Sequence, residues 1–289
     1  MAHFVNLRTP PAGQTLGPFI HVFGTFMRSS ASVLLTVISL AMLSPLALAG
    51  PLNDTGIDFC RDPVTGADTT VTAATTCTAA QGRQDARFGR DPAAARNAFV
   101  KVGGGSKGFD FTKIANNGSA LPASAALGAN PTDWACTYDN NTGLMWEVKV
   151  NDNTKLRHQD WSYTWYDSVH NYGGNPGTAS GGTCLSAGRC DTEKFVADVN
   201  TATAALCGKT DWRMPTLNEL KRIVDRGIAS PGPTIDATYF PNTPSSAFWS
   251  GSPFAGNSDY AWFVYFNNGF GNAYGRSLTH QVRLVRAGR

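Results

Sequence analysis

The sequence contains little glutamate and little charge of either sign. Only three of its 289 residues are Glu and 16% are charged, whereas Gly and Pro number 30 and 16. Long helices are usually rich in Glu and avoid Gly and Pro, so this composition excludes coiled coils and helical repeats. Because 42% of the residues are hydrophobic and 11% aromatic, a disordered chain and a transmembrane bundle are excluded as well. We expect a compact fold with many turns.

The chain also lacks a strong net charge. Its formal charge is +3 at pH 7, and Arg8 and Arg28 lie in a segment that we expect to be absent from the mature protein. A nearly neutral surface has no long-range field to attract nucleic acid, since phosphate binding needs clustered Lys and Arg. We therefore expect no nucleic-acid partner. The positive excess is local, because residues 209–289 contain nine basic and five acidic residues.

Sequence motifs for catalysis and metal binding are missing. His158, His170 and His280, the histidines after residue 50, form neither His-x-His nor His-Glu-x-x-His. The chain has no Gly-x-Ser-x-Gly nucleophile turn and no Gly-rich phosphate loop. The five acidic residues of segment 209–289 are too few for a carboxylate cage around Ca²⁺ in the C-terminal loops. We expect no enzymatic activity, no cofactor and no metal.

An export signal begins at Met27. A basic start at Arg28 precedes the apolar run 33–43, and Ala-Leu-Ala at 47–49 forms a small-x-small cleavage site. The apolar run is too short to span a bilayer in the usual way. We therefore predict a secretory signal peptide over 27–49, with residues 1–26 a misannotated upstream extension. A membrane anchor is the alternative; the expected location is periplasmic, cell-surface or secreted.

All six cysteines follow the predicted cleavage site. They are Cys60, Cys77, Cys136, Cys184, Cys190 and Cys207. An even number of cysteines in an exported chain indicates disulfides, and zinc is disfavoured because no Cys-x-x-Cys pair is present. Spacing alone does not choose among the possible pairings. Our working prediction is Cys60 with Cys77, Cys136 with Cys207, and Cys184 with Cys190.

The large side chains are concentrated in the second half of the chain. Every tryptophan lies after residue 133, whereas residues 50–132 are rich in Ala, Thr, Gly and Asp. Trp side chains dominate core burial, so we expect a small N-terminal lobe over 50–132 and the main domain over 133–289. The tryptophans are Trp134, Trp146, Trp161, Trp165, Trp212, Trp249 and Trp262.

Periodicity predicts two helices in the main domain. The first covers 192–206, with apolar residues at helical spacing and a stop at Gly208. The second starts at Thr216, which forms a capping box with Glu219, and stops at Gly227. Short strand patterns occupy 144–148, 248–250, 262–266 and 282–285. Few helices combined with short strands predict an α+β fold.

Several of these segments, in this order, resemble one bacterial family. They are Thr-Gly-Leu-Met-Trp at 142–146, Asp-Trp-Arg-Met-Pro-Thr at 211–216, Glu-Leu at 219–220, Phe-Trp-Ser at 248–250, Trp-Phe-Val at 262–264 and Val-Arg-Leu-Val-Arg at 282–286. The resemblance, over about 133–287, is to the Lcl C-terminal domain family, a domain of unknown function.

That family is similar to the C-type-lectin-like superfamily. The resemblance therefore implies a disulfide-bonded domain with two helices, a small twisted antiparallel sheet and long loops on one face. Some members are surface adhesins for sulphated glycosaminoglycans or other ligands, and some are variable proteins of diversity-generating retroelements. The formylglycine-generating relatives need a late reactive cysteine pair, which is missing here because no cysteine follows Cys207.

The C-terminal loops have the composition of a recognition surface. Tyr and Phe alternate with Asn and Gly between residues 257 and 280, as in antibody loops. Such loops suit a glycan or protein ligand, although Asn-Gly is also a standard hairpin turn. The predicted ligand-binding residues are Tyr260, Asn267, Asn268, Phe270, Asn272, Tyr274, Arg276 and His280.

Other interpretations remain open at this point. The segment 211–216 could be a binding site, but a structural role is favoured, with Trp212 in the core and Pro215 and Thr216 setting the helix start. A structural component of the cell envelope that self-associates is the alternative function. Arginine forks could also hold a sulphated glycan. The basic residues concerned are Lys221, Arg222, Arg226, Arg276, Arg283, Arg286 and Arg289.

Overall fold

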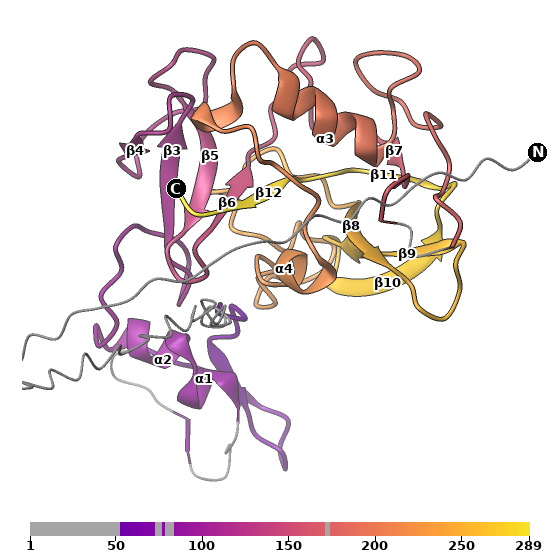
Figure 1. Cartoon of the computed structure of the whole chain (residues 1–289). Coiled ribbons are helices and arrows are strands. Elements are labelled where there is room, and N and C mark those ends of the chain that lie inside the picture. Colours follow the sequence, from indigo (N-terminus) through magenta and orange to yellow (C-terminus); the bar gives the residue numbers. More distant parts are fainter. Residues whose placement is uncertain (1–52, 73–76, 79–83, 171–173) are drawn as a thin grey trace, which may run out of the picture. The chain divides into compact units, whose positions relative to one another are not determined.

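The computed structural model describes residues 53–72, 77–78, 84–170 and 174–289 (Figure 1). The predicted extension 1–26 and signal peptide 27–49 lie outside these residues. Strands outnumber helices, and every paired strand is antiparallel, so the described part of the chain is mixed helix and sheet, as the α+β prediction requires. No helix within the described ranges is long and apolar enough to cross a membrane.

A five-stranded sheet forms one half of the main domain. Its order is β12 (Val285–Ala287), β6 (Leu144–Glu147), β5 (Trp134–Asp139), β3 (Phe111–Ala115) and β4 (Ala120–Leu121). The turn between β5 and β6 forms because Asp139 accepts the amides of Asn141 and Thr142, while Gly143 adopts a positive φ of 73°. Strands β3 and β4 precede the expected boundary at 132, yet they belong to this sheet.

A three-stranded sheet forms the other half. Its order is β10 (Phe270–Gly275), β9 (Tyr260–Tyr265) and β8 (Ala247–Pro253). A short pair of β7 (Tyr163–Thr164) and β11 (Thr279–His280) accompanies it. The expected strands 248–250 and 262–266 are therefore confirmed with small shifts of their ends.

The residues before β3 have a small core of their own. They contain the pair β1 (Phe59–Arg61) and β2 (Asp68–Thr70), then α1 (Asp85–Phe88) and α2 (Arg90–Ala95). Cys60, Val71, Cys77 and Ala86 are buried together there.

The first predicted helix is shorter than its apolar periodicity indicated. Helix α3 (Thr192–Thr201) starts at Asp191, whose side chain accepts the Lys194 amide, but it ends before the expected residue 206. Ala202 turns to an extended ψ of 137°, and the chain returns through a 3₁₀ turn, η2 (Leu206–Gly208). Asn200 hydrogen-bonds both backbone groups of Trp212, which fixes the segment after the turn against the helix end.

The second predicted helix has the expected start and an earlier end. Helix α4 (Leu217–Lys221) begins with the full capping box between Thr216 and Glu219. It stops six residues before Gly227 because later amides bond to other segments: that of Asp225 to Thr234 and that of Arg226 to Thr55. Ile223 and Val224, which follow the helix, are nevertheless buried in the core.

Three disulfides stabilise these elements, and all three predicted pairs are confirmed. Cys60 pairs with Cys77, Cys136 with Cys207, and Cys184 with Cys190. The Cys136–Cys207 bond spans 71 residues and joins β5 to η2. Closing so long a loop removes much of the conformational freedom of the unfolded chain.

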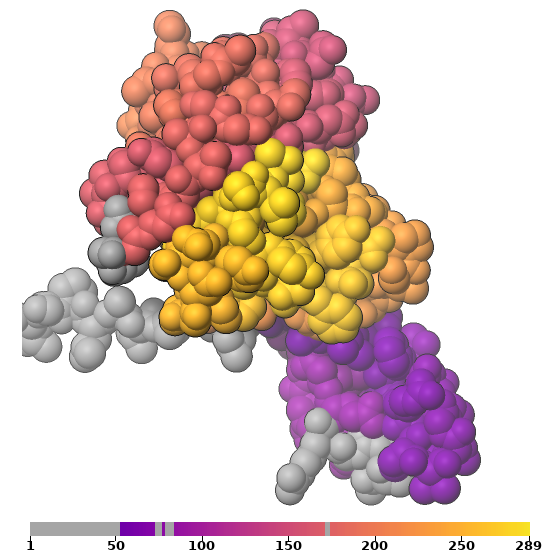
Figure 2. All heavy atoms as spheres, turned by 90° about the vertical axis from the view of Figure 1, so that its right-hand side faces the viewer, coloured from indigo at the N-terminus to yellow at the C-terminus, as the bar shows by residue number. Residues whose placement is uncertain are grey.

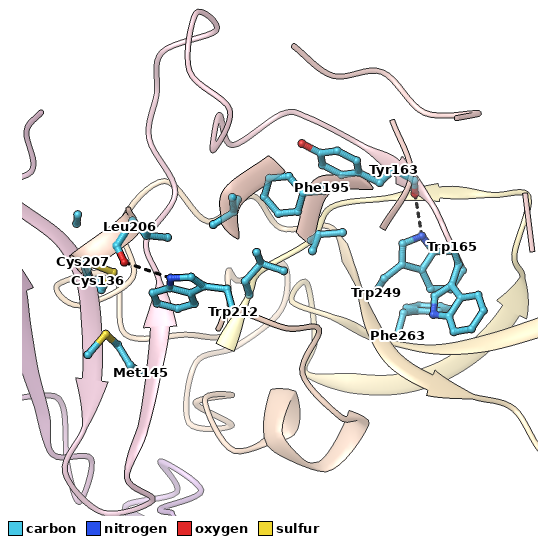
Figure 3. Packing of buried hydrophobic residues seen from close by; sticks show 14 of the residues in the cluster. Cys136, Met145, Tyr163, Trp165, Phe195, Leu206, Cys207, Trp212, Trp249 and Phe263 are labelled. Atoms are coloured by element: carbon cyan, nitrogen blue, oxygen red, sulfur yellow. Dashed lines mark hydrogen bonds between the residues drawn. A yellow bond between two sulfur atoms is a disulfide. The ribbon is translucent and has the colours of Figure 1, made fainter. Parts of the chain in front are cut away.

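Tryptophans anchor the larger core cluster (Figure 3). At one end the Trp212 indole donates to the Leu206 carbonyl at 3.2 Å, next to the Cys136–Cys207 bond. At the other end the Trp249 indole donates to the Tyr163 carbonyl at 2.9 Å. Trp212 is thus a core residue, as predicted for this part of segment 211–216.

A buried ion pair lies between the two halves of the domain. The Glu147 carboxylate is 2.8 Å from the Lys149 ammonium, and both side chains are almost fully buried. Glu147 also accepts the amide of Leu284, while Arg283 donates to the Glu147 carbonyl and to Thr243. The Leu284 carbonyl still accepts the Glu147 amide, but the Leu284 amide and the Glu147 carbonyl bond to side chains, so the strand predicted over 282–285 starts only at Val285.

Glu147→Gln should lower the free energy of unfolding by about 3 kcal/mol or more, because it leaves two buried cations without their counter-charge. Denaturant unfolding measures this loss. The control is Asp198→Asn, which breaks the more exposed pair with Arg189 and should cost less than about 1 kcal/mol. Equal losses in the two variants would contradict the role given to Glu147.

Candidate functional site

The β9–β10 hairpin exposes a row of large side chains. Along β10 the residues Phe270, Asn272 and Tyr274 are exposed and alternate with Gly271, Ala273 and Gly275, as the period of a strand requires. Phe270 is 66% exposed and Tyr274 48%, and Tyr265, opposite Phe270 on β9, is 40% exposed. We call Tyr265, Phe270, Asn272 and Tyr274 the hairpin surface. The C-terminal residues, yellow in Figure 2, occupy the middle of the face shown there.

One side of the hairpin surface packs on aromatic residues of the core. Tyr274 stacks on Phe263 with ring centroids 5.6 Å apart, and Phe263 packs edge-on against buried Trp249. On the opposite side of the strand, a Cβ at Gly271 would lie 2.7 Å from the Lys221 side chain of α4. Gly271 is therefore covered by side chains of α4, and the large residues of β10 all point to the other side.

Asn267 and Asn268 form the hairpin turn. The Asn268 side chain accepts the Phe270 amide at 3.0 Å, and Gly269 has a positive φ of 74°. Asn267 accepts from the Ser230 hydroxyl and donates to the Pro231 carbonyl. These two predicted site residues are half-buried and shape the turn.

Arg276 lies inside the protein. It is 3% exposed, with its guanidinium 4.1 Å from the centre of the Trp165 ring. It donates to the backbone carbonyls of Tyr260 and Asn175, so it links β9 to a distant loop. Tyr260 itself is half-buried at the start of β9. Neither side chain joins the hairpin surface.

Other basic residues considered for an anionic ligand are also engaged. Arg283 is buried beside Glu147, and burial lowers its pKa to about 10. Arg286 pairs with Asp211 at 2.6 Å. Arg276, Arg283 and Arg286 are thus used in internal contacts, whereas Lys221 and Arg222 are half-buried and Arg226 is exposed.

His280 is held between two aromatic rings. Its ring centroid is 4.3 Å from that of Trp249 and 4.7 Å from that of Phe263. Burial lowers the pKa of His280 from 6.5 to about 4, and its Nε2 has no partner within the described ranges. His280 is therefore neutral at pH 7 and supports the ring on which Tyr274 stacks.

A cleft of about 680 Å³ was not anticipated from the sequence. It lies between the start of α3, residues 165–170, residues 213–216 and the end of β8. Trp165, Val196, Met214 and Pro253 give it a largely apolar lining. The segment 211–216 is the sequence feature that could have indicated this cleft. Its residues Arg213, Met214 and Thr216 line the cleft, while Trp212 lies in the core.

Stability should depend on pH through His280. The unfolded chain protonates this residue near pH 6.5 and the folded chain only near pH 4. Stability is therefore full above pH 6.5 and falls by about 2 kcal/mol as the pH falls towards 4. Comparing urea unfolding at about pH 7.5 and about pH 4.5 measures the loss.

His280→Gln should remove this part of the pH dependence, since glutamine does not titrate. The matched control, His170→Gln, replaces an exposed histidine and should leave the dependence unchanged. An identical slope in the protein and in His280→Gln would show that His280 does not titrate as described.

One family model matches the chain. It is that of the Lcl C-terminal domain, and it covers residues 135–286, more than half of the chain. No curated protein and no solved structure matches the chain. The matched region starts at β5 and includes α3, α4, the hairpin surface and the cleft. This protein therefore belongs to the Lcl C-terminal domain family.

Proposed function

We propose that this protein is an exported binding protein, and that its C-terminal domain holds a glycan or protein ligand on the hairpin surface. The observation that carries the proposal is the arrangement of β10. Three alternate residues, two aromatic and one amide, point outwards from an edge strand that pairs only with β9 among the described strands. Large apolar side chains exposed together are costly unless a partner covers them.

The chemistry of the hairpin surface suits recognition. Tyr and Phe supply large contact areas with few rotatable bonds, and the Asn272 amide can both donate and accept hydrogen bonds. Stacking of Tyr274 on Phe263 reduces the freedom that binding would otherwise remove. The surface is therefore organised before a ligand arrives.

The positions of the arginines favour an uncharged ligand on the hairpin surface. Arg276 and Arg286, two of the arginines that could grip sulphate, are turned elsewhere: Arg276 towards backbone carbonyls and Arg286 towards Asp211. Arg226 is exposed, but it lies beside Gly269, apart from the face that carries Phe270, Asn272 and Tyr274. A flat aromatic face suits the apolar side of a sugar ring or a protein surface. We therefore favour a neutral glycan or a protein over a sulphated glycosaminoglycan.

Two further features belong to this proposal. The three disulfides support export to an oxidising compartment, in agreement with the signal predicted over 27–49. We also infer a C-type-lectin-like arrangement for the family domain, because α3, α4 and the two antiparallel sheets agree with that plan. We propose no catalytic role. A self-associating envelope component and a retroelement-diversified receptor are the alternatives.

Replacing Phe270, Asn272 and Tyr274 together by Ala should weaken ligand binding at least about 100-fold, because central aromatic contacts carry most of the binding energy. Phe270 and Asn272 are exposed and should contribute little to stability, whereas loss of the Tyr274–Phe263 stacking should lower the free energy of unfolding by about 1 kcal/mol. A glycan array, with neutral and sulphated sugars over a salt series, identifies the ligand whose affinity is then measured.

Phe88→Ala is the matched control, since Phe88 is also exposed, at 70%, but lies on α1. It should bind as the unchanged protein does. Unaltered affinity in the folded triple variant would refute the assigned surface. Binding that weakens steeply as the salt concentration rises would instead indicate an anionic ligand such as a sulphated glycan. If no glycan on the array binds and the protein associates with itself in size-exclusion chromatography as its concentration rises, the envelope component is favoured.

A further inference from the structure

Three carboxyl groups converge in the part of the chain that precedes the family domain. They belong to Asp54, to Asp85 at the start of α1 and to Asp91 in the first turn of α2. One carboxylate oxygen of each lies within 4.8 Å of the corresponding oxygens of the other two. Asp54 is 6% exposed and Asp91 3% exposed, so the cluster is nearly closed to solvent.

Two oxygens of this cluster have no partner. Asp54 Oδ1 accepts the amides of Thr55 and Gly56, and Asp91 Oδ1 accepts the amide of Gly108. The Oδ2 atoms of Asp54 and Asp91 are both buried, and neither has a hydrogen-bond partner among the residues that the structure describes. A buried carboxylate oxygen without a partner is costly, so this arrangement needs an occupant.

Among the residues that the structure describes, no side-chain cation forms an ion pair with the cluster. Across the described ranges, none of the ion pairs within 4.0 Å involves Asp54, Asp85 or Asp91. Arg90 is close in sequence, but its guanidinium donates to Gly108 and Asn141 and packs over the Phe99 ring at 3.8 Å. The negative charge of the three acids is therefore not neutralised by an ion pair within the described ranges, although Lys101 attracts Asp54 and Asp91 from a greater distance.

Glycines allow the carboxyl groups to approach one another. A Cβ at Gly108 would lie 1.5 Å from Asp54 Oδ2, and one at Gly89 would lie 2.3 Å from Asp85 Oδ1. The backbone at both positions thus packs directly on the acids. Side chains here would push the cluster apart.

We propose that Asp54, Asp85 and Asp91 bind a Ca²⁺ ion. Ca²⁺ prefers carboxylate oxygens, takes six to eight ligands in irregular geometry, and accepts both one and two oxygens from a carboxylate. Mg²⁺ is less suited because it demands a near-octahedral set and keeps its water. The ion would join the segment at residue 54 to α1, α2 and the Gly108 loop. This site lies outside the C-terminal loops, whose few acids led us to expect no metal.

A proton is the competing occupant. Asp54 and Asp91 lie within hydrogen-bonding reach of each other, and burial, followed by the charge of Asp54, raises the pKa of Asp91 to about 8. A shared proton would neutralise one charge and compete with a metal for the two carboxylates. Titration with the metal therefore separates the two possibilities.

The test uses the purified, disulfide-bonded full chain after removal of metals with a chelator. Isothermal titration with CaCl₂ should show saturable binding of one ion per chain. At a Ca²⁺ concentration about 100 times the Kd, the melting temperature should rise by about 5 °C or more. Neither heat nor a shift with Ca²⁺ up to about 10 mM would overturn the proposal in favour of the shared proton.

Asp54→Asn and Asp91→Asn should each abolish the Ca²⁺-dependent shift. Asp68→Asn is the control, because Asp68 is an exposed carboxylate on β2 that pairs only with Arg61 within the described residues, and it should keep the full shift. An undiminished shift in both cluster variants would place the ion elsewhere and overturn the assignment. If a cluster variant does not fold, titration of the unchanged protein still decides between the metal and the proton.

Discussion

The buried charge of Glu147 organises the main domain. It stands at the end of β6, where its carboxylate meets Lys149 and the Leu284 amide and its carbonyl meets Arg283. A charge without these partners would be very costly in this interior, so the C-terminal segment must return to β6 in one position. That position fixes β12 in the large sheet and β11 beside β7. His280, which supports the hairpin surface, lies on the same segment.

The candidate site is consequently a product of long-range packing. Tyr274 rests on Phe263, Phe263 on Trp249, and the Trp249 indole is fixed by the Tyr163 carbonyl. Arg276 joins β9 to the loop at Asn175 and packs on Trp165. Only the outermost layer of this arrangement faces solvent. Figure 1 shows β10, the strand that carries this layer, at the edge of the three-stranded sheet.

Local signals in the sequence predicted the features that depend on local chemistry. The capping box at Thr216, the turn at Gly143 and the amphipathic start of α3 follow from neighbours in the chain. The C-terminal end of α4 could not be predicted from local signals, because the amides of Asp225 and Arg226 find partners in distant segments. The three disulfide pairs were predicted as well, although the spacing of the cysteines alone left them open.

The residues of the site were predicted less completely. Composition singled out the C-terminal hairpin, and the alternation along β10 explains why Phe270, Asn272 and Tyr274 are exposed. Composition could not show that Arg276 is buried, because an arginine in a polar loop resembles an exposed one until Trp165 covers it. The Asp54 cluster could not be predicted from the sequence either. Its three members are separated along the chain by turns and helices, and only the fold brings them together.

Exposed and half-buried residues alternate along β10, and this pattern affects which of its positions can be substituted. Gly271 lies beneath the Lys221 and Leu217 side chains of α4, whereas on the opposite face Phe270 and Asn272 are exposed and Tyr274 stacks on Phe263. Folding therefore constrains positions 271 and 274 more than positions 270 and 272. A change at 270 or 272 alters the surface offered to a ligand at little cost in stability. Relatives with the same backbone can in this way present different surfaces.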